Sequence, residues 1–456
     1  MTMNSAERTT PSTAFLDHAT AGITARMADV TEAAAAAEPP RLDAYQGQET
    51  AWKAASISAE ALEPALTDLL CNLHAHPELA FEEVHAQATL TALLEERGFR
   101  VEQGVHEVGT ALRTEWTSPG YDAEQHRTVA IMSEYDALPG IGHACGHNII
   151  AAAGIGAFLA AVDAAQAAGI DGRLVLLGTP AEEGHSGKEY MIRGGMLDDI
   201  DMAIMIHPFG YDIASHYWLG RRTLQVTFRG VAAHASSQPF MGRNALDAAT
   251  LAYQAMGLLR QQMAPSDRLH AVITEGGHRP SVIPEQATMD IYVRSLLTDS
   301  LVDLSARVDD ILDGAALMTG CRVEKTWDVH PATLPIRNNQ ALAERWTRTQ
   351  ALRGRVAVPA GVVPDSLAAS TDFGNVSQLV PGIHPMVKVS PSDVALHTAA
   401  FATWAAGEEA TRAAVDSAAG LAQVAVDTLA DDALAAAARA EFEATGGRFS
   451  VAEQLG

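Results

Sequence analysis

Residues 129–168 read VAIMSEYDALPGIGHACGHNIIAAAGIGAFLAAVDAAQAA, and they indicate the architecture of the chain. The stretch opens with the apolar run Val129 to Met132, which has the length and composition of a buried strand. It closes with residues 148–168, an alanine-rich apolar run with the length of a helix. A buried strand followed by a buried helix is the repeating unit of α/β proteins, whose central sheet is mostly parallel.

The same alternation extends on both sides of this stretch. Helical spacing of apolar residues predicts helices over 57–73 and 81–97, and apolar runs predict buried strands over 173–178 and 202–206. The pattern resumes after about Pro335 and ends in a helix over 400–429, with one more surface helix over 431–443. We therefore expect an α/β domain with a central, mostly parallel sheet flanked by helices.

Residues 222–327 follow a different order. Strands are predicted over 222–229, 269–275, 288–294 and 322–327, and helices over 244–263 and 301–318. This β-α-β-β-α-β order is that of a ferredoxin-like α+β module, with both helices on one face of an antiparallel sheet. The expected domains are an N-terminal extension (1–55), a discontinuous larger domain (56–219 and 336–456) and an inserted domain (220–335).

Composition excludes several classes of protein. A net charge of −25 argues against nucleic acid or an anionic membrane as a partner. No apolar run of about 18 to 20 residues and no signal sequence is recognised, which predicts a protein outside the membrane. Three cysteines scattered over 456 residues do not form a disulfide framework. We therefore expect a cytoplasmic protein.

The first candidate site is His143-Ala144-Cys145-Gly146-His147, between the predicted strand and helix. Thiolate and imidazole together suit zinc and neighbouring divalent ions, whereas magnesium and calcium sites are built from oxygen. A buried cysteine is, however, usually a small hydrophobic residue, and a single histidine is usually structural. The rest of the chain has to distinguish these interpretations.

Further candidate ligands follow other predicted strands and loops. Glu182 and Glu183 come after the strand over 173–178, His207 directly follows the strand over 202–206, and His397 precedes the last long helix. Each alone could be solvated or structural. Together with the first site they offer more ligands than the three of a mononuclear catalytic zinc site, which favours two metal ions sharing a bridging group. The candidate ligands are Cys145, His147, Glu183, His207 and His397.

At this point the chain resembles the dinuclear metallopeptidase family of aminoacylase and carboxypeptidase G. Within that family it is similar to the amidohydrolase subfamily of indole-acetyl-amino-acid hydrolases, aminobenzoyl-glutamate hydrolase and aminoacyl-lysine-type dipeptidases. The resemblance covers about residues 61–429. The motifs that carry it are residues 76–83 (HPELAFEE), 134–140 (EYDALPG), 143–147 (HACGH), 180–184 (PAEEG), 207–208 (HP), 370–376 (STDFGNV) and His397.

The resemblance implies a role for each matching residue. The five candidate ligands match the family's ligand positions, with Cys145 bridging, and Glu182 matches the general base. Asp136 matches an acid that orients the site. His234 matches a histidine of the inserted lid and dimerisation domain that supports the oxyanion in the partner subunit's site. Arg294 and Ser281 stand at substrate-binding positions, where Arg294 would bind a carboxylate or, alternatively, pair with a surface acid.

The implied function is that of a metal-dependent amidohydrolase or dipeptidase. It would cleave an N-acyl or aminoacyl amide bond to an amino acid by metal-activated water, with two divalent ions, zinc or manganese first and cobalt or nickel as further options. One alternative keeps the chemistry but acts on a xenobiotic or secondary-metabolite amide or carbamate. A remote alternative is a catalytically silent binding protein. The expected partners are a small amide or dipeptide and a second copy of the chain.

Three positions qualify this assignment. Many relatives in the wider family have a histidine ligand where this chain has Glu134, and Cys145 and His147 are taken to replace it. Relatives often have an asparagine where this chain has Ser281, which bears on the substrate class. His143 matches no ligand position, so we expect its loss to weaken the site less than the loss of Cys145.

Overall fold

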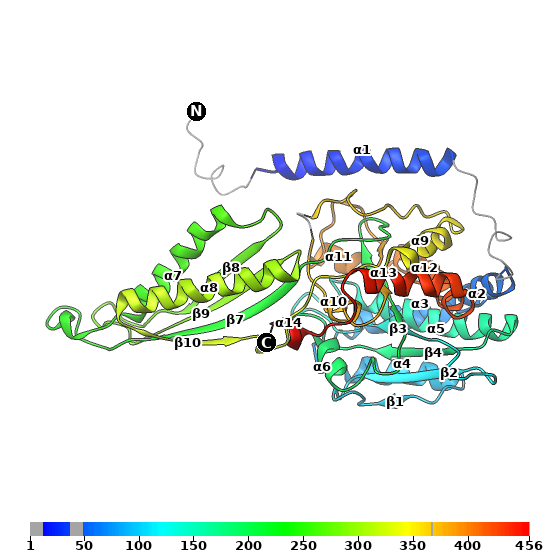
Figure 1. Cartoon of the computed structure of the whole chain (residues 1–456), viewed down its shortest axis with the longest axis horizontal. Helices are drawn as coiled ribbons and strands as arrows, with labels where there is room; N and C mark the ends of the chain where they lie inside the picture. The colour runs from blue at the N-terminus through cyan, green and yellow to red at the C-terminus, as the bar shows by residue number, and fades with distance from the viewer. Residues whose placement is uncertain (1–11, 37–48, 366–367, 456) are drawn as a thin grey trace.

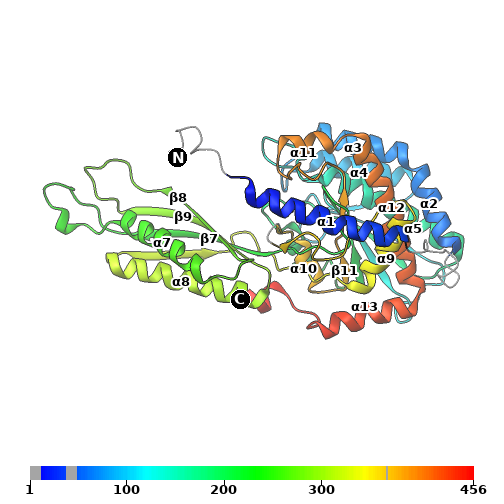
Figure 2. The same cartoon turned by 90° about the horizontal axis from the view of Figure 1, so that it is seen from above.

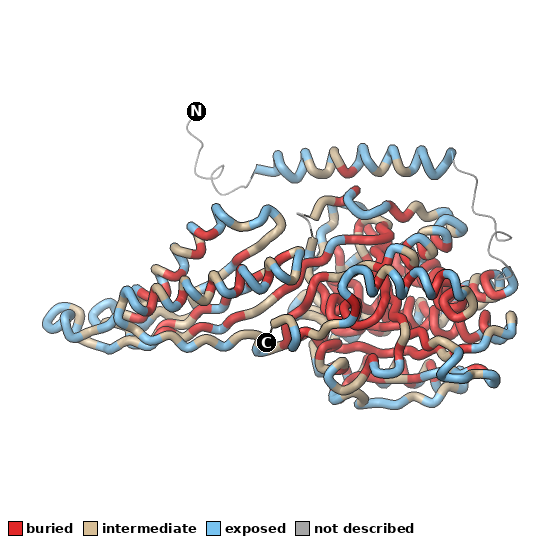
Figure 3. The backbone as a smooth tube through the Cα atoms, viewed as in Figure 1, coloured by how far each residue is buried: buried red, intermediate tan, exposed pale blue. Residues whose placement is uncertain are grey.

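A computed structural model describes residues 12–36, 49–365 and 368–455. The molecule is elongated, with a larger part and a smaller part that meet end to end (Figures 1 and 2). Each part contains its own sheet and its own hydrophobic core. Buried residues are concentrated in the larger part, while the far end of the smaller part is mostly exposed (Figure 3).

The larger part is built on a six-stranded sheet in the order β1-β2-β4-β3-β5-β11. β3 (Thr128–Ser133) lies parallel to both β4 (Arg173–Gly178) and β5 (Met202–Ile204), and β5 lies parallel to β11 (Gly382–Ile383). β2 (Leu112–Thr117) and β1 (Glu102–Gln103) add an antiparallel edge. The mostly parallel sheet is confirmed; the two edge strands were not predicted, because β2 mixes charged and apolar residues.

The helix of the opening stretch, α5 (His147–Ala168), is the centre of the larger core. It packs against α2 (Glu49–Ala61), α3 (Glu63–Ala75) and α12 (Glu408–Ala430). Gly154 allows α5 to approach β3, since a Cβ there would lie 2.0 Å from Ser133 Oγ. Contrary to the expectation that no apolar run is long enough, α5 could cross a membrane by length and composition, but it is almost entirely buried inside the protein.

Two predicted helices are interrupted. The helix expected over 57–73 is divided between α2 and α3, because Pro64 stands in the first turn of α3. The helix expected over 400–429 is divided between α11 (Ala399–Trp404) and α12, with Gly407 at the N-cap of α12. The helix expected over 81–97 begins later, as α4 (Val84–Glu96), because Phe81 has a left-handed backbone with φ 66°.

The smaller part has a four-stranded antiparallel sheet in the order β10-β7-β9-β8. Its strands are β7 (Gly220–Arg229), β8 (Arg268–Glu275), β9 (Gln286–Ser295) and β10 (Arg322–Trp327). α7 (Ala245–Leu259) and α8 (Thr298–Thr319) cover one face (Figure 2). Alternate β9 residues such as Met289 and Ile291 are buried in this core, as expected for a strand with one face covered by helices.

The N-terminal extension contributes a separate helix, α1 (Ala14–Ala36), which runs across the larger part (Figures 1 and 2). Ile23 of α1 joins a small apolar cluster with Ile213 and Trp218. Residues 1–11 and 37–48 of the extension lie outside the described residues. The boundary expected at residue 55 falls within α2, whose Trp52 is fully buried.

The remaining elements are short or peripheral. They are α6 (Gly187–Arg193), β6 (His207–Phe209), η2 (Pro239–Met241), η3 (Arg260–Gln262), α9 (Gln340–Ala351), α10 (Phe373–Ser377), β12 (Met386–Lys388), α13 (Asp432–Ala444) and α14 (Val451–Leu455). β6 and β12 form a two-stranded parallel ribbon beside the main sheet. This ribbon carries His207 at its first position.

Candidate metal centre

A tight turn between β3 and α5 presents Cys145 and His147. Gly146 forms the N-cap of α5 with φ 82°, a conformation that glycine adopts without strain. A Cβ at Gly146 would also lie 2.9 Å from Pro208 Cγ. The glycine in HACGH is therefore required by the backbone, and it brings the two candidate ligands close to the strand that carries His207.

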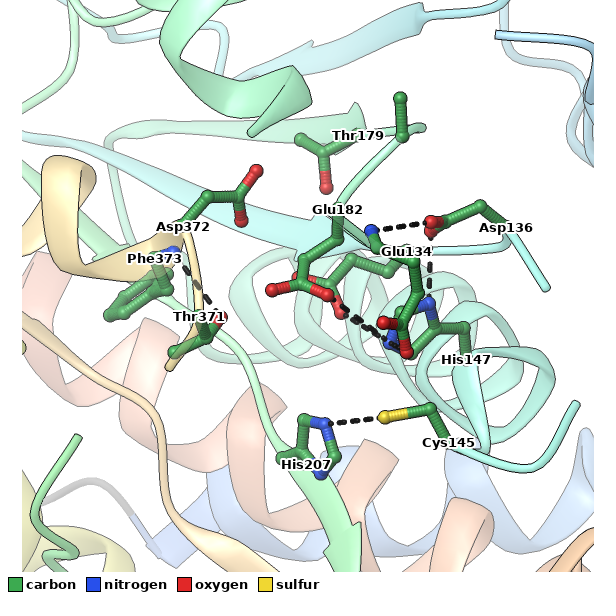
Figure 4. Close-up of polar contacts among 12 residues, drawn as sticks. Glu134, Asp136, Cys145, His147, Thr179, Glu182, His207, Thr371, Asp372 and Phe373 are labelled. Carbon is green, nitrogen blue, oxygen red and sulfur yellow. Dashed lines mark hydrogen bonds and ion pairs between the residues drawn. The ribbon is translucent and has the colours of Figure 1, made fainter. Parts of the chain in front are cut away.

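Asp136 fixes the orientation of the next two side chains. Its Oδ1 lies 2.9 Å from His147 Nδ1, and its Oδ2 accepts a hydrogen bond of 2.8 Å from the backbone N–H of Glu183 (Figure 4). Nδ1 of His147 is thus engaged, and Nε2 is the nitrogen left to bind a metal ion. The position fits the orienting role expected for Asp136.

The loop after β4 holds the adjacent acids Glu182 and Glu183. It begins with Ala181, which has φ 61°, and the buried carboxylate of Glu83 accepts a hydrogen bond of 2.9 Å from Ala181 N–H. The other oxygen of Glu83 accepts a bond of 2.7 Å from Thr110 Oγ1. A strained, non-glycine residue supported by a buried acid is a feature of functional loops.

His207 and His397 approach Cys145 from two further elements. Cys145 Sγ lies 3.5 Å from His207 Nε2 and 3.3 Å from His397 Nε2. His397 Nε2 also lies 3.2 Å from Glu183 Oε1. His397 has φ 60°, and its backbone N–H donates to Ala144 O at 2.9 Å. That bond ties the C-terminal histidine to the HACGH turn, although the two are far apart in the sequence.

These side chains form three overlapping groups in which every potential ligand atom lies within 4.8 Å of the others. The groups are Cys145, His147 and His207; Cys145, Glu183 and His397; and His147, Glu182 and Glu183. All five predicted ligands and Glu182 are therefore brought together. Cys145, His147 and Glu183 each belong to two of the groups.

The donor set fits divalent cations by a second observation. His147 Nε2 and Glu183 Oε1 are buried atoms without a hydrogen-bond partner. Burial, and then the charge of Glu183, raises the pKa of the Cys145 thiol well above its usual value. Burial and the neighbouring carboxylates also raise the pKa of Glu182. A bound cation is the charge that offsets both effects and uses the unpaired donor atoms.

A buried ionic cluster behind this centre was not predicted. Lys188 is fully buried, and its Nζ donates to Glu134 Oε1 and to Asp372 Oδ1, the latter at 2.6 Å. Glu134 therefore lies beside the candidate metal centre. The family resemblance implies that Cys145 and His147 replace the histidine ligand that many relatives have at the position of Glu134. The sequence did not predict the burial of Lys188, because a lysine at the start of a helix is just as often exposed.

Two predicted substrate-binding residues lie outside these groups. Arg294 of β9 is directly opposite Arg221 of β7. Both guanidinium groups lie against the Tyr292 ring, at 5.7 Å and 5.9 Å from its centroid, and among the described residues no ion pair links either arginine to an acid. The alternative expected for Arg294, pairing with a surface acid such as Asp290 or Glu285, is not observed. Arg221 is 8% exposed and donates to Ser186 Oγ at 3.2 Å, at the end of the sheet nearest the larger part.

His234 and Ser281 lie at the other end of the smaller part. Both are exposed, and a backbone bridge joins His234 to Val282. His234 Nδ1 accepts hydrogen bonds from the backbone of Ser236 and Ser237 at 3.2 Å. The ten residues of β7 span about 30 Å and separate this end from the larger part. A cavity of about 600 Å³ lies here, lined in part by Ala232 and Val282.

A second cavity, of about 350 Å³, opens beside the candidate metal centre. Its walls are mostly apolar, with Leu79, Leu138 and Pro139 among them, and Glu183 lies on its border. The cavity is large enough for a small acyl or aminoacyl group next to the ligand atoms.

His143 is buried but belongs to none of the metal-ligand groups. Burial lowers the pKa of His143 to about 3, and its ring stacks on His74 with the centroids 6.4 Å apart. The placement agrees with a structural role for this histidine.

Comparison with protein families matches residues 130–447 to the model of peptidase family M20/M25/M40. The Xaa-Arg dipeptidase of Mus musculus is 36% identical over 80% of this chain and 86% of the mouse protein. A chain of the p-aminobenzoyl-glutamate hydrolase of Escherichia coli is 32% identical, and the match covers 59% of each protein.

Solved structures show the same fold. A dinuclear metal binding peptidase of the M20 family from Bacillus subtilis aligns with a TM-score of 0.61 and 21% identity, covering 81% of this chain and 99% of that protein. The aminobenzoyl-glutamate utilization protein of Klebsiella pneumoniae aligns with a TM-score of 0.61 and 22% identity, covering 81% and 97%.

Proposed function

The chain belongs to peptidase family M20/M25/M40 and is a metal-dependent hydrolase of amide bonds, and from this premise we propose its substrate and the roles of its residues. We propose that it cleaves the amide bond between an acyl or aminoacyl group and an amino acid with a free carboxylate. The observation that carries this proposal is the candidate metal centre together with the pair of arginines, Arg221 and Arg294, at the end of the smaller part nearest the larger part.

Five side chains would hold two divalent cations, with zinc or manganese proposed first: Cys145, His147, Glu183, His207 and His397. The position of Cys145 Sγ, between His207 and His397, supports a bridging thiolate. When bound, the cations would polarise the amide carbonyl and acidify a water molecule. Cobalt and nickel suit the same donors.

Glu182 would act as the general base. Its Oε2 lies 4.0 Å from His147 Nε2, at the edge of the ligand cluster, whereas Oε1 of the neighbouring Glu183 lies 3.2 Å from His397 Nε2. Glu182 would accept the proton of the attacking water and return it to the departing nitrogen. Asp136 would keep His147 and Glu183 in register through its two hydrogen bonds.

Arg294 would bind the substrate carboxylate, with Arg221 beside it. Burial, and then the charge of Arg221, lowers the pKa of Arg294, so an anion between the two guanidinium groups would relieve a like-charge contact. Two adjacent arginines offer the planar donors that match a carboxylate. Their place at the larger-part end of β7 suits a substrate that reaches the metal centre.

His234 would serve the site of a second copy of the chain. It is exposed at the far end of a strand of about 30 Å and cannot lie beside the metal centre of its own subunit without a large rearrangement. We therefore propose a homodimer in which the far end of the smaller part, including Ser281, reaches the partner's site, where the imidazole would support the developing oxyanion.

The proposal is tested with metal-reconstituted protein and a panel of amides. The panel contains N-acyl amino acids, dipeptides that include Xaa-Arg peptides because of the mouse relative's activity, and matched amides that lack a carboxylate. Turnover of carboxylate-bearing substrates supports the proposal. Turnover confined to the uncharged amides or carbamates would instead favour the second candidate, a xenobiotic or secondary-metabolite hydrolase, which Ser281 in place of an amide side chain would permit.

A further inference from the structure

The ionic cluster of Glu134, Lys188 and Asp372 lies directly behind the candidate metal centre. All three residues are fully buried, and Lys188 bonds one oxygen of each acid (Figure 4 labels Glu134 and Asp372). The second oxygen of Asp372 accepts a hydrogen bond of 2.9 Å from the backbone N–H of Lys188. Asp372 is thus satisfied on both oxygens within the cluster.

The second oxygen of Glu134, in contrast, is not satisfied within the cluster. Glu134 Oε2 is buried and has no hydrogen-bond partner. It lies 3.4 Å from His147 Nε2, closer than the nearest oxygens of Glu182 and Glu183, which are both at 4.0 Å. A buried carboxylate oxygen without a hydrogen-bond partner is costly, and in a folded protein such an oxygen is usually satisfied by a water molecule or by an ion.

Because His147 Nδ1 is engaged by Asp136, the two atoms that lack a hydrogen-bond partner, Glu134 Oε2 and His147 Nε2, lie next to each other, although Glu134 belongs to none of the three metal-ligand groups described above. Two donors bound tetrahedrally to one first-row ion at about 2.1 Å lie about 3.4 Å apart. The observed separation of 3.4 Å equals this value. Lys188, on the far side of the carboxylate, holds the orientation of Glu134, as outer partners of metal ligands do.

We propose that Glu134 is a sixth protein ligand, which coordinates through Oε2 the cation held by His147. The inference rests on the proposed function, since it assumes that divalent ions bind at this centre. It adds a carboxylate to the five expected ligands and makes Lys188 the residue that positions it. The competing interpretation is an ion pair between Glu134 and a protonated His147, in which Nε2 carries hydrogen and Glu134 contributes nothing to metal affinity.

The experiment measures metal binding rather than turnover. Protein stripped with a chelator is titrated with Zn²⁺ against a chromophoric competitor, and bound metal is counted by elemental analysis. Absorption of the Co²⁺-loaded protein reports the ligand set. The test variant is Glu134→Gln, and the matched control is Asp372→Asn, which also alters a Lys188 partner but removes no oxygen facing His147.

We expect Glu134→Gln to weaken one of the two ions about 10- to 100-fold and to change the Co²⁺ spectrum, with Asp372→Asn close to the parent. Glu134→Asp, which keeps the charge but withdraws the oxygen, should give an intermediate loss and serves if Glu134→Gln does not fold. Unchanged affinity and spectrum in these Glu134 variants, or an equal loss in Asp372→Asn, would overturn the inference. A parent protein that binds no divalent ion would contradict the proposed function itself.

Discussion

The larger and smaller parts of the chain hold their polar groups in opposite ways. In the larger part, ligand atoms from separate segments converge within 4.8 Å in overlapping groups, and neighbours such as Asp136 and Ala144 orient them. In the smaller part, Arg221 and Arg294 have no acid partner among the described residues, and His234 is exposed. The first set of groups is brought together within one chain, whereas the second set is the one proposed to meet a substrate or another copy of the chain.

This contrast is the one expected if the larger part carries out the chemical step and the smaller part recognises the substrate. The candidate metal ligands lie mostly on turns and loops beside the six-stranded sheet, and Lys188 and Glu83 support these segments through buried hydrogen bonds. The groups proposed to meet the substrate, Arg294 and His234, lie on the smaller part, which projects away from the larger part (Figure 1). Changes in the larger part should therefore affect turnover and metal content, and changes in the smaller part should affect substrate affinity and depend on the oligomer.

The largest effect is expected at Glu182. Replacement by Gln should lower kcat by about 10²- to 10⁴-fold, because the proton acceptor is lost while the ligands remain. Steady-state kinetics measure the loss, and elemental analysis should find the parent's metal content. Activity surviving at the parent level would contradict the role of Glu182 as base.

The next effect concerns metal retention. Cys145→Ala should lose at least one of the two ions after dialysis, because Sγ contacts His207 and His397 and joins two ligand groups. His143→Ala, the control in the same turn, should keep both ions, since His143 belongs to no group. Elemental analysis of the two dialysed proteins distinguishes them, and equal losses would show that the turn, not the thiolate, matters.

A mixing experiment tests whether the smaller part serves another copy. His234→Ala and Glu182→Ala should each lower activity by about 10²-fold or more. Heterodimers formed from the two would contain one site with both residues intact, so mixed and exchanged subunits should recover about a quarter of the parent activity. No recovery after verified subunit exchange would mean that His234 acts within its own chain or not at all.

Arg294 should control affinity for the carboxylate. Arg294→Ala should raise KM for carboxylate-bearing substrates roughly 10- to 100-fold, as loss of a charged hydrogen bond predicts, with a smaller change in kcat. The control is the same substrate with its carboxylate converted to an amide, on which the variant and the parent should be alike. An unchanged kcat/KM on every carboxylate-bearing substrate would exclude this role.

The smallest effect is on stability and comes from Glu83. Burial, and then the charge of Asp136, raises the pKa of Glu83 to about 7 in the folded protein, against about 4.3 when unfolded. The folded state therefore binds the proton more tightly, and stability is lost as the pH rises from about 4.3 through 7.

Glu83→Gln, which can keep both hydrogen bonds, should remove this loss. The free energy of unfolding of the metal-free parent should fall relative to the variant between about pH 5 and 8, by on the order of 1 to 3 kcal/mol. Urea unfolding at both pH values measures the difference. Parallel pH profiles would show that Glu83 does not titrate in this range.

Much of the fold and of the candidate metal centre could be predicted, because both follow local patterns. Apolar strands and helical spacing identified β3, β4 and α5, and soft ligands beside strand ends identified Cys145, His147 and His207. Pro64 and Gly407, where the two predicted helices are interrupted, can be read in the sequence. The apolar spacing continues across both residues, however, and it predicted a continuous helix in each case.

The rest depends on tertiary contacts that leave no local pattern. Lys188 looks like an exposed lysine until the fold buries it between Glu134 and Asp372, residues from distant segments. Likewise, the pairing of Arg221 with Arg294 becomes apparent only from the strand register, which sets the two residues opposite each other. A single sequence carries neither fact.

The length of β7 has a practical consequence for protein design. The strand acts as a spacer of fixed reach, because its ten residues set the distance between the Arg294 end and the His234 end. Inserting two residues in β7 and two in its neighbour β9 would preserve which side chains face each side but extend the reach by about 7 Å. In the proposed homodimer, the length of β7 and β9 would set how far the His234 end reaches toward the partner subunit's site. Changing this length would therefore be a way to select longer or shorter substrates without altering any catalytic side chain.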